Sequence, residues 1–573
     1  MTVATRTDHG RAAMLLPVLL LLALGYLGPL GMVAWTSLRR AGQTSLAAYA
    51  EILAQPVFLD IFLRTLTTAG IVTLFCTAIG YPFAYLVATR ARSWAGLVMA
   101  LVAMPYLTSI LIRSYAWVAI LGGGGLVNRA LMALGLIEDP LRLVFNSFGS
   151  YVGMVQVLLP MMVLPLYAAM RRIDPTLLRA GASLGGGPAS VFATVFLPLS
   201  MPGLAAGAAL VFLSALGFYI TPALLGAPGD YMLAQAIEVR VTTLAEFDVA
   251  AALSWMLFAM VAMLLLFLRR WIVPLGEEQP TARPSRVRAV ASTAAIARLV
   301  QRAGDRLAPL AGPLLWIHGM LVLTFLLAPM VVVVLIAFSS APYLTFPPPS
   351  YSWRWFVAFF RDTNWLQAGW FSLWVSTAAA VTTLAIGTPF AFALARGCFA
   401  GRRLLWLLAV SPMILPHIVI GLGLFFTFVA LGLNGHPVSF WIAYVVTGLP
   451  YVVIVLVAAL GRFDRDMERA ATSLGAAPLT VFRTVTLPLL AASFATAFLF
   501  AFLSGFDDLI IGLFLSSPRG TTLAIRMWED IRLEISPKTA VVGALQLAVL
   551  LVVLGARGLS GWVGQLRRQR TSS

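Results

Sequence analysis

The sequence predicts an all-α polytopic membrane protein with about twelve transmembrane helices, arranged as two six-helix halves. Over 573 residues, 60% are hydrophobic and only 11% are charged, and the mean hydropathy is +0.93. Soluble domains contain about 25% charged residues. Charge-free apolar runs recur along the chain, and each is close to the ~20 residues that a helix needs to cross a bilayer. Short sequence blocks also recur between the two halves of the chain.

Six apolar runs are predicted to span the membrane in the first half. The first contains 27 residues without a charge, whereas the apolar core of a signal peptide has about 7–15. We therefore expect it to be a retained span. The six runs cover residues 12–38, 65–89, 95–112, 143–170, 197–229 and 249–268.

Six further runs are predicted to span the membrane in the second half. An even total places both termini and the central connection on the same side. These runs cover residues 312–342, 366–395, 404–432, 437–461, 484–506 and 539–556.

The distribution of charge predicts which side that is. Of the 39 arginines and lysines, 26 fall on the side of the termini and 13 on the other, while the acidic residues divide 8 to 14. Loops rich in arginine and lysine stay cytoplasmic. The termini and the connection are therefore predicted to be cytoplasmic. A net charge of +17 could instead indicate nucleic-acid binding. Topology accounts for the basic excess, so no nucleic-acid partner is expected.

The connection over residues 271–311 is predicted to be a cytoplasmic linker between a first membrane domain, 1–270, and a second, 312–573. It begins with Glu277-Glu278, and its arginines from Arg286 to Arg306 alternate with apolar residues. This pattern is typical of a basic amphipathic segment on anionic lipid. A plain tether is the alternative.

An internal repeat relates the two halves. Residues 79–84 (IGYPFA) match 386–391 (IGTPFA) at an offset of 307, whereas Leu159-Pro160 matches Leu449-Pro450 at an offset of 290. An extra external loop of 17 residues in the first half explains the difference. Repeated halves are one way in which transporters build a pathway along a pseudo-two-fold axis.

The closest match between the halves is predicted to lie on cytoplasmic loops. Residues 174–185 (DPTLLRAGASLG) align with 464–475 (DRDMERAATSLG), and both continue to a Leu-Pro pair. Asp174 and Asp464 are suitable N-caps, and glycine is the usual residue just past a helix end. Each copy therefore predicts a short capped helix, followed by a turn at Leu-Pro. Such a helix could dock into a partner's groove or be an ordinary loop helix.

No catalytic or metal-binding arrangement is present in the sequence. A P-loop requires G-x-x-x-x-G-K-[ST], and the only lysine, Lys538, follows Ser-Pro. The four histidines form no metal motif, and no G-x-S-x-G elbow occurs. The chain has only two cysteines, Cys76 and Cys398, so neither a disulfide framework nor a thiolate metal site is expected. The chain is not predicted to be an enzyme.

The repeated loop resembles the coupling loop of permease subunits of binding-protein-dependent ABC importers, Glu-Ala-Ala-x3-Gly-x9-Ile-x-Leu-Pro. Both copies place an arginine where glutamate is usual, and Glu468 lies one position earlier. The resemblance implies that both loops dock onto cytoplasmic ATPase subunits. The coupling residues that it implies are Asp174, Arg179, Ala180, Gly185, Leu197 and Pro198 in the first copy, and Asp464, Glu468, Arg469, Ala470, Gly475, Leu487 and Pro488 in the second.

Further segments resemble spermidine/putrescine-type importers. Residues 113–117 (RSYAW) and 215–226 (ALGFYITPALLG) are similar to the first permease of such systems. Residues 412–417 (PMILPH), 504–508 (SGFDD) and 521–526 (TTLAIR) are similar to the second. The two usual subunits thus look fused in one chain. This implies the type I ABC importer permease fold and alternating access. The expected partners are a cytoplasmic ABC ATPase dimer that binds ATP-Mg, an external substrate-binding protein and membrane lipid, and no cofactor is expected on this chain.

Polar groups within apolar runs are candidate pathway residues, because they are costly in lipid. The adjacent carboxylates Asp507 and Asp508 suit an amine cation, although they could instead cap a helix. His417 follows a proline within an apolar run and could be a ligand or a partner of a neighbouring span. Aromatic rings can stack on a cation or anchor a span at the interface. The aromatic candidates are Tyr115, Trp117, Phe218 and Tyr219.

A polyamine or related amine is the expected substrate class, although no predicted span of the first half contains an acidic residue to bind one. The alternative function is a secondary transporter driven by an ion gradient. That class would be expected to carry ionisable residues in several spans, and it would have no use for paired coupling helices.

Overall fold

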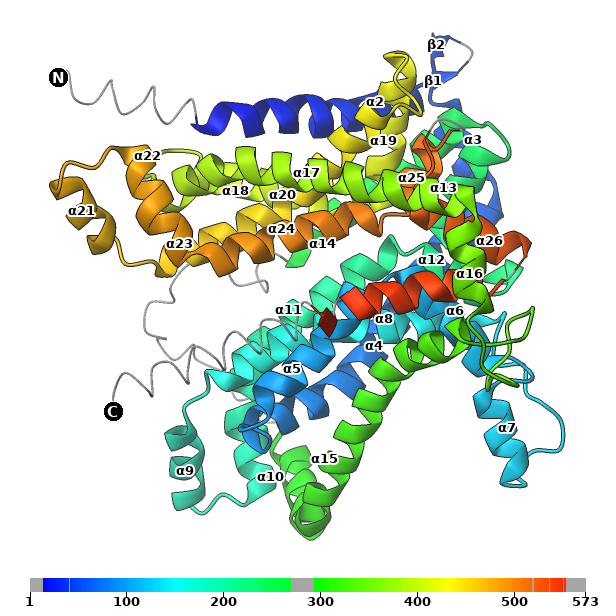
Figure 1. Ribbon diagram of the computed structural model, residues 1–573. Coiled ribbons are helices and arrows are strands. Elements are labelled where there is room, and N and C mark those ends of the chain that lie inside the picture. Colours follow the sequence, from blue (N-terminus) through cyan, green and yellow to red (C-terminus); the bar gives the residue numbers. More distant parts are fainter. Residues whose placement is uncertain are drawn as a thin grey trace.

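The computed structural model describes residues 14–40, 42–268, 293–517, 520–534, 536–549 and 551–552, which are almost entirely helical (Figure 1). Among these residues, nine helices are long and apolar enough to cross a membrane, or eleven if two bent helix pairs each count as one span. A multi-span helical membrane protein is thus confirmed, whereas the predicted number of twelve is not. Only part of the last predicted span is described, as the short helix Lys538–Val549.

The first half contains one β-ribbon and a series of helices. In chain order they are η1 (Ala23–Leu27), α2 (Gly28–Ser37), β1 (Arg39–Arg40), β2 (Gln43–Thr44), α3 (Ala47–Ala54), α4 (Pro56–Thr89), α5 (Ala95–Ala103), η2 (Met104–Leu107), α6 (Ile110–Leu121), α7 (Leu126–Ala133), α8 (Ser147–Arg171), α9 (Pro175–Ser183), α10 (Pro188–Val191), η3 (Phe192–Phe196), α11 (Leu197–Leu216), α12 (Ile220–Leu225), η4 (Pro228–Asp230), α13 (Leu233–Thr242) and α14 (Phe247–Leu268).

The second half follows a similar order. Its labelled helices are α15 (Thr293–Ala337), α16 (Arg354–Arg361), α17 (Thr363–Arg396), α18 (Arg402–Ile414), α19 (His417–Ala430), α20 (Pro437–Arg462), α21 (Asp466–Ser473), α22 (Pro478–Val481), η5 (Phe482–Thr486), α23 (Leu487–Leu489), α24 (Ala491–Phe506), α25 (Ile510–Leu515) and α26 (Leu523–Leu533).

The third predicted span, 95–112, is placed incorrectly. The chain breaks around Pro105, in the 3-10 turn η2, and α6 begins afterwards at Ile110; the candidate span that starts there covers Ile110–Ala133 and includes α7. The run predicted from the sequence stopped at Arg113 because an arginine usually marks a loop. A charge that faces the protein interior can nevertheless lie within a span, and Arg113 does so.

The two halves exchange their outer helices. Helix α2 of the first half packs on α19 of the second, where Gly423 approaches the backbone of Pro29 (Figure 1). Helix α15 of the second half packs in turn on α4 and α6 of the first. The last described helix also crosses over, since Gly543 lies against Ile112 of α6. Each bundle in space is therefore built from both halves of the sequence.

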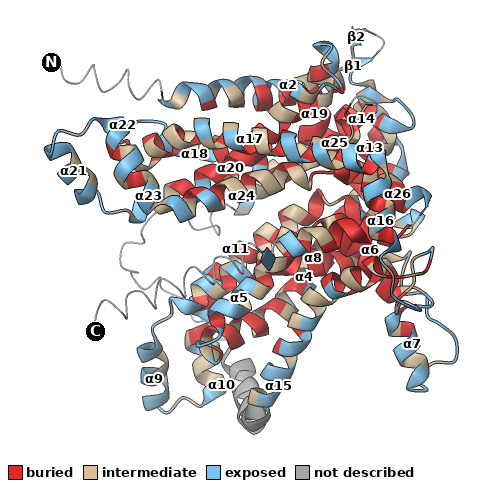
Figure 2. Ribbon diagram, viewed as in Figure 1, coloured by how far each residue is buried: buried red, intermediate tan, exposed pale blue. Residues whose placement is uncertain are grey.

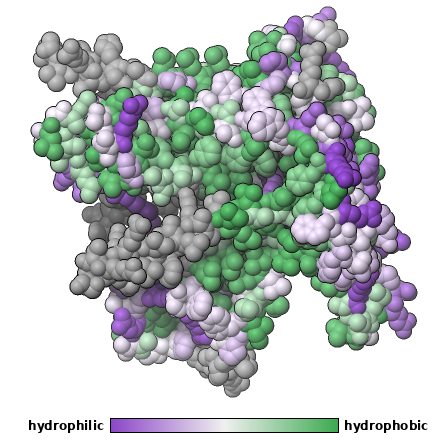
Figure 3. Space-filling model, viewed as in Figure 1, coloured by the Kyte–Doolittle hydropathy of each residue, from purple (hydrophilic) through white to green (hydrophobic). Residues whose placement is uncertain are grey.

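Apolar side chains face both the interior and the outside. Trp365, Tyr115 and Tyr444 are fully buried, whereas Leu24 and Trp370 on membrane-length helices are exposed (Figure 2). The outer surface is hydrophobic across its middle, with hydrophilic residues gathered towards both ends (Figure 3). Helices whose outer face is apolar in this way are suited to contact with lipid.

The two ends of the molecule carry different short helices. Helices α9 and α21 lie at one end, and α3, α13, α16 and α26 lie at the opposite end (Figure 1). Most of the predicted linker, residues 271–292, lies outside the described residues. Its remainder belongs to α15, which begins at Thr293, so residues 293–311 are helical and continuous with the next span.

Candidate functional site

Helices α9 and α21 are the short helices that the repeat predicts. Asp174 caps α9, because its carboxylate accepts a hydrogen bond from the Thr176 N–H at 2.9 Å. This bond lowers the pKa of the Asp174 carboxyl below its usual value. Asp464 accepts the equivalent bond from the Asp466 N–H at 3.0 Å. The predicted N-terminal contacts are therefore confirmed, although α21 itself begins two residues after Asp464.

Both helices end at the predicted glycine with the same backbone geometry. Gly185 has a φ of +83° and Gly475 a φ of +85°, a left-handed conformation that favours glycine. The Gly185 N–H donates to the Ala182 carbonyl, and the Gly186 N–H donates to the Gly181 carbonyl. Gly475 and Ala476 repeat these two bonds. This is the Schellman arrangement, which satisfies carbonyls at the end of a helix.

Each short helix presents two apolar side chains outward. Leu177 and Leu184 of the first copy are 47% and 89% exposed, and Met467 and Leu474 of the second are 50% and 88% exposed. The two positions are seven residues apart, which places them on one face, two turns from each other. The repeat therefore keeps the same pair of exposed apolar side chains on one face of each short helix.

The arginines of the two motifs point to solvent. Arg179 and Arg469 are exposed, as are Ala180 and Ala470 beside them. Among the described residues Arg469 pairs only with exposed Asp466, at 2.9 Å, and exposed pairs of this kind contribute little stability. Both arginines are therefore available to a partner.

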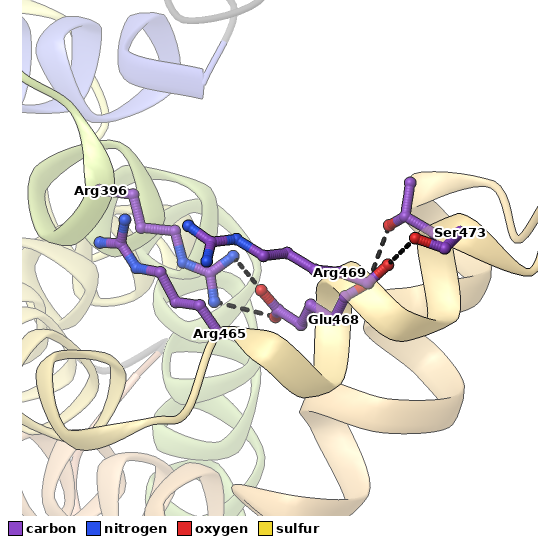
Figure 4. A pocket seen from close by; sticks show the side chains of 6 residues that line it. Arg396, Arg465, Glu468, Arg469 and Ser473 are labelled. Atoms are coloured by element: carbon purple, nitrogen blue, oxygen red, sulfur yellow. Dashed lines mark hydrogen bonds and ion pairs between the residues drawn. The ribbon is translucent and has the colours of Figure 1, made fainter.

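Glu468 does not face outward but is held against the membrane part of the second half. Its carboxylate makes two contacts with Arg396 at the end of α17, at 2.6 and 2.8 Å (Figure 4). It also accepts a hydrogen bond from Thr486 of η5. Burial alone would raise the pKa of Glu468, but these hydrogen bonds and the charge of Arg396 outweigh it and lower the pKa. Arg396, Arg465, Glu468 and Arg469 line an open pocket beside α21.

The predicted turn at the Leu-Pro pair is wrong in the first copy. There Leu197-Pro198 opens α11 directly after the π-helical turn η3, and the chain is helical from Pro188 to Leu216. Proline is tolerated in a first helical turn, where its missing N–H costs no bond, and the wider π turn supplies the local adjustment. In the second copy Leu487-Pro488 opens α23 after η5, but α23 ends at Leu489 and the chain bends by 80° before α24, so a turn follows the pair there.

The structure brings His417 and Asp508 together. The His417 Nδ1 lies 3.1 Å from one carboxylate oxygen of Asp508, and the other oxygen accepts the Ile511 N–H at 2.7 Å. Asp507 turns instead towards the first half and accepts the Ile110 N–H of α6 at 3.2 Å. Both carboxylates therefore interact with the N-terminus of a helix, and Asp507 does so across the boundary between the halves.

Sequence analysis missed Arg113 as a membrane residue. Its side chain is buried at 3% exposure, and its Nε donates to the Ser109 carbonyl at 3.4 Å. The signal available in the sequence was the absence of turn residues between 106 and 121, since the first glycines follow only at 122–125.

The aromatic candidates lie where the halves meet. Tyr115 donates its hydroxyl to the Ser536 carbonyl at 3.1 Å, and Tyr219 packs on Trp528. Trp117 packs on Phe325 of α15. Three of the four are buried, and Phe218 is partly buried. Their contacts join the halves of the sequence near the end opposite α9 and α21.

Comparison with known proteins identifies the family. The profile described as "Binding-protein-dependent transport system inner membrane component" matches residues 387–568. The spermidine/putrescine transport system permease protein PotB of Salmonella typhimurium (strain SL1344) is 34% identical over 218 residues, covering 38% of this chain and 76% of PotB. This chain belongs to the family of binding-protein-dependent transport system inner membrane components. It is thus a transport permease and not an enzyme.

Other relatives agree with this assignment. The putrescine transport system permease protein PotI of Escherichia coli (strain K12) is 33% identical over 247 residues, covering 42% of this chain and 85% of PotI. The permease is about half as long as this chain, so the repeat reflects the fusion of two permease halves. A chain of a bacterial alginate ABC transporter, solved in complex with a pentasaccharide-bound periplasmic protein, is 19% identical and covers 48% of this chain with a TM-score of 0.40. That likeness is too loose to transfer geometry.

Proposed function

We propose that this chain supplies both permease halves of an ABC importer that moves polyamines or related small amines into a bacterial cell. The observation that carries this proposal is the pair of short helices α9 and α21, with the same caps and the same exposed apolar positions. A membrane protein without a partner has no evident use for two such helices. An ABC ATPase dimer has two subunits and could receive one helix in each, with ATP-Mg bound to the ATPase.

The proposed topology places α9 and α21 in the cytoplasm. Arginines are concentrated at that end of the predicted topology, as expected for cytoplasmic loops. The termini and the connection over 271–311 would share this side, in the inner membrane, and the connection would join membrane domains 1–270 and 312–573.

The arrangement of the two halves is that expected of an inward-open state, with contacts at the end opposite α9 and α21. There Gly217 of the first half approaches Pro416 of the second so closely that an added Cβ would lie 2.5 Å from it. The hydrogen bond between Tyr115 and Ser536 lies towards the same end. The ends that carry α9 and α21 diverge (Figure 1). Transport would require the reverse arrangement as a second state, which ATP and substrate favour to different degrees.

The proposed substrate class rests on the relatives and on the acidic groups. PotB and PotI are named for spermidine and putrescine transport. Asp507, Asp508 and His417 are the proposed pathway groups, and the end opposite α9 and α21 would meet an external substrate-binding protein.

The test is uptake of labelled putrescine into proteoliposomes that contain this chain. It is measured with the ATPase, the binding protein and ATP together, and with each left out in turn. We expect uptake only with all components present. Uptake that persists without ATPase and follows an imposed ion gradient would favour the secondary transporter instead.

A further inference from the structure

An open basic pocket of about 540 Å³ lies between the end of α17 and α21. It is lined by Arg396, Arg465, Glu468, Arg469, Thr472 and Ser473. Three guanidinium groups therefore share this pocket with a single carboxylate. Figure 4 shows the side chains of the three arginines extending towards the same region. A cleft lined mainly by charges of one sign concentrates ions of the opposite sign, so the pocket favours an anion.

The carboxylate of the pocket is already engaged by one of the three arginines. Glu468 contacts both terminal nitrogens of Arg396, at 2.6 and 2.8 Å. Such bidentate pairs are strong and fix the geometry of both groups. Within the described residues, Glu468 makes no ion pair with Arg465 or Arg469. Its charge is therefore used on Arg396, and the other two arginines are left with little compensation.

Most donors of these two arginines are available to a ligand. Arg465 makes no ion pair within the described part of the chain, and its hydrogen bond to the Ala395 carbonyl is long, at 3.5 Å. Arg469 uses one terminal nitrogen for Asp466, whose side chain is 78% exposed. A guanidinium group carries five N–H donors. Arg465 and Arg469 can therefore contact one anion together.

The first copy of the repeat does not carry these charges. It keeps Arg179 at the position of Arg469, but Thr89, Pro175 and Leu178 stand at the positions of Arg396, Arg465 and Glu468. The caps and the outward apolar side chains, in contrast, are common to α9 and α21. A docking role shared by the two helices does not require the pocket. Its charges therefore indicate a second role, which is confined to α21.

We propose that this pocket binds a phosphate group, which Arg465 and Arg469 contact while Arg396 adds positive charge. Guanidinium groups match phosphate oxygens in bidentate geometry. The phosphate belongs either to a phospholipid headgroup or to a free phosphate ion. The lipid is a possible source because Arg396 ends α17, a membrane-length helix. Bound phosphate would fix α21 against the end of α17, and the proposal does not depend on the transported substrate.

The test measures hydrogen exchange over residues 466–473 in the full chain, without any ATPase. The chain is held in nanodiscs of phosphatidylcholine, whose phosphate is balanced by its own ammonium group. In one arm, sodium phosphate is titrated against sodium chloride at equal ionic strength. In the other arm, phosphatidylglycerol replaces part of the phosphatidylcholine, and free phosphate is omitted.

A double variant removes the two arginines that would contact the anion, as Arg465→Gln/Arg469→Gln. The matched control is Arg402→Gln/Arg403→Gln, which removes two exposed arginines at the start of α18, soon after Arg396. Both pairs of substitutions change the net charge equally. Both also lie at exposed positions, where substitutions usually alter stability by less than about 0.5 kcal/mol.

We expect at least one phosphate source to slow exchange in wild type and in the control. The Arg465→Gln/Arg469→Gln variant should raise the apparent Kd for that source about tenfold or more, since one hydrogen bond to a charged group contributes about that factor. Slowing by phosphatidylglycerol without free phosphate would identify the lipid as the source. Slowing by sodium phosphate alone would identify the free ion.

Three results would overturn the proposal. They are unchanged exchange of wild type with both phosphate sources, slowing that survives in full in Arg465→Gln/Arg469→Gln, and an equal loss in the control. If the double variant does not fold, Arg469→Gln alone decides, and it must weaken the effect of phosphate. Because no ATPase or substrate is present, failure here leaves the proposed transport function untouched, and failure of transport leaves this result untouched.

Discussion

Replacing the outermost leucines of the two short helices should weaken the complex with the ATPase by a calculable amount. Leu184 and Leu474 are 89% and 88% exposed in the free chain. Leucine to alanine removes three carbon groups, each contributing about 0.8 kcal/mol when buried. If a partner groove covers each leucine fully, one substitution costs about 2 kcal/mol, which is roughly a 30-fold rise in Kd.

The double variant tests whether both helices dock. The two sites are far apart in the chain and would dock on different subunits of the ATPase dimer, so their effects should add to about 4 kcal/mol, or several hundred-fold in Kd. The assay is titration of the purified ATPase against the labelled chain in detergent. Leu533→Ala is the matched control, because Leu533 is 82% exposed at the opposite end.

The stability of the chain itself should not change, since substitutions at exposed positions usually shift it by less than about 0.5 kcal/mol. Two results would refute the reasoning. One is a Kd that changes less than threefold in the double variant, and the other is an equal loss in Leu533→Ala.

Three further predictions follow from local geometry. Glu468→Gln should lower the free energy of unfolding by about 1–3 kcal/mol, because it weakens the contact with Arg396. Since the pKa of Glu468 is lowered in the folded chain, this advantage of wild type is full above about pH 4.3 and is lost as the pH falls through the folded-state pKa. Melting curves of wild type and variant across pH would check this. Gly475→Ala should destabilise the end of α21 by about 1 kcal/mol through its positive φ, and Gly475→Asn should cost less, as hydrogen exchange over residues 466–473 would report. Lys538 is the only lysine of the sequence and is paired with Asp362 at 3.0 Å. A membrane-impermeant amine reagent applied from outside should therefore label Lys538 faster in Asp362→Asn than in wild type. Labelling only from the cytoplasmic side would contradict the proposed topology.

Local structure at the short helices was predictable because local rules determine it. An aspartate before the helix and a glycine after it act on backbone groups within a few residues of themselves. The repeat supplied a second copy of the same signals. The turn predicted at the Leu-Pro pair of the first copy was wrong for a similarly local reason, since proline is compatible both with a turn and with the first turn of a helix.

Long-range packing could not be predicted in the same way. Nothing in the sequence of α2 indicates that it packs on α19 of the other half as well as on α14 of its own, because an apolar surface has no partner preference that its sequence alone reveals. Arg113 was predicted to lie outside the spans because an arginine usually marks a loop. The helix that contains it is held by a residue that is distant in the sequence, since Asp507, which accepts the N–H of Ile110, lies about 400 residues further along the chain.

The two short helices are alike on their outer face and different on their inner face. Leu184 and Leu474 present the same side chain outward, so a dimer of identical ATPase subunits could receive both. On the inner face, the position of Glu468 is occupied by Leu178 in the first copy, which packs against the apolar core. One helix is thus anchored to the membrane part by an ion pair and the other by apolar contact. Since ion pairs weaken with salt and acid while apolar contacts do not, high salt or low pH should loosen α21 before α9. Hydrogen exchange that protects both helices equally under those conditions would show that the anchors are equivalent in strength.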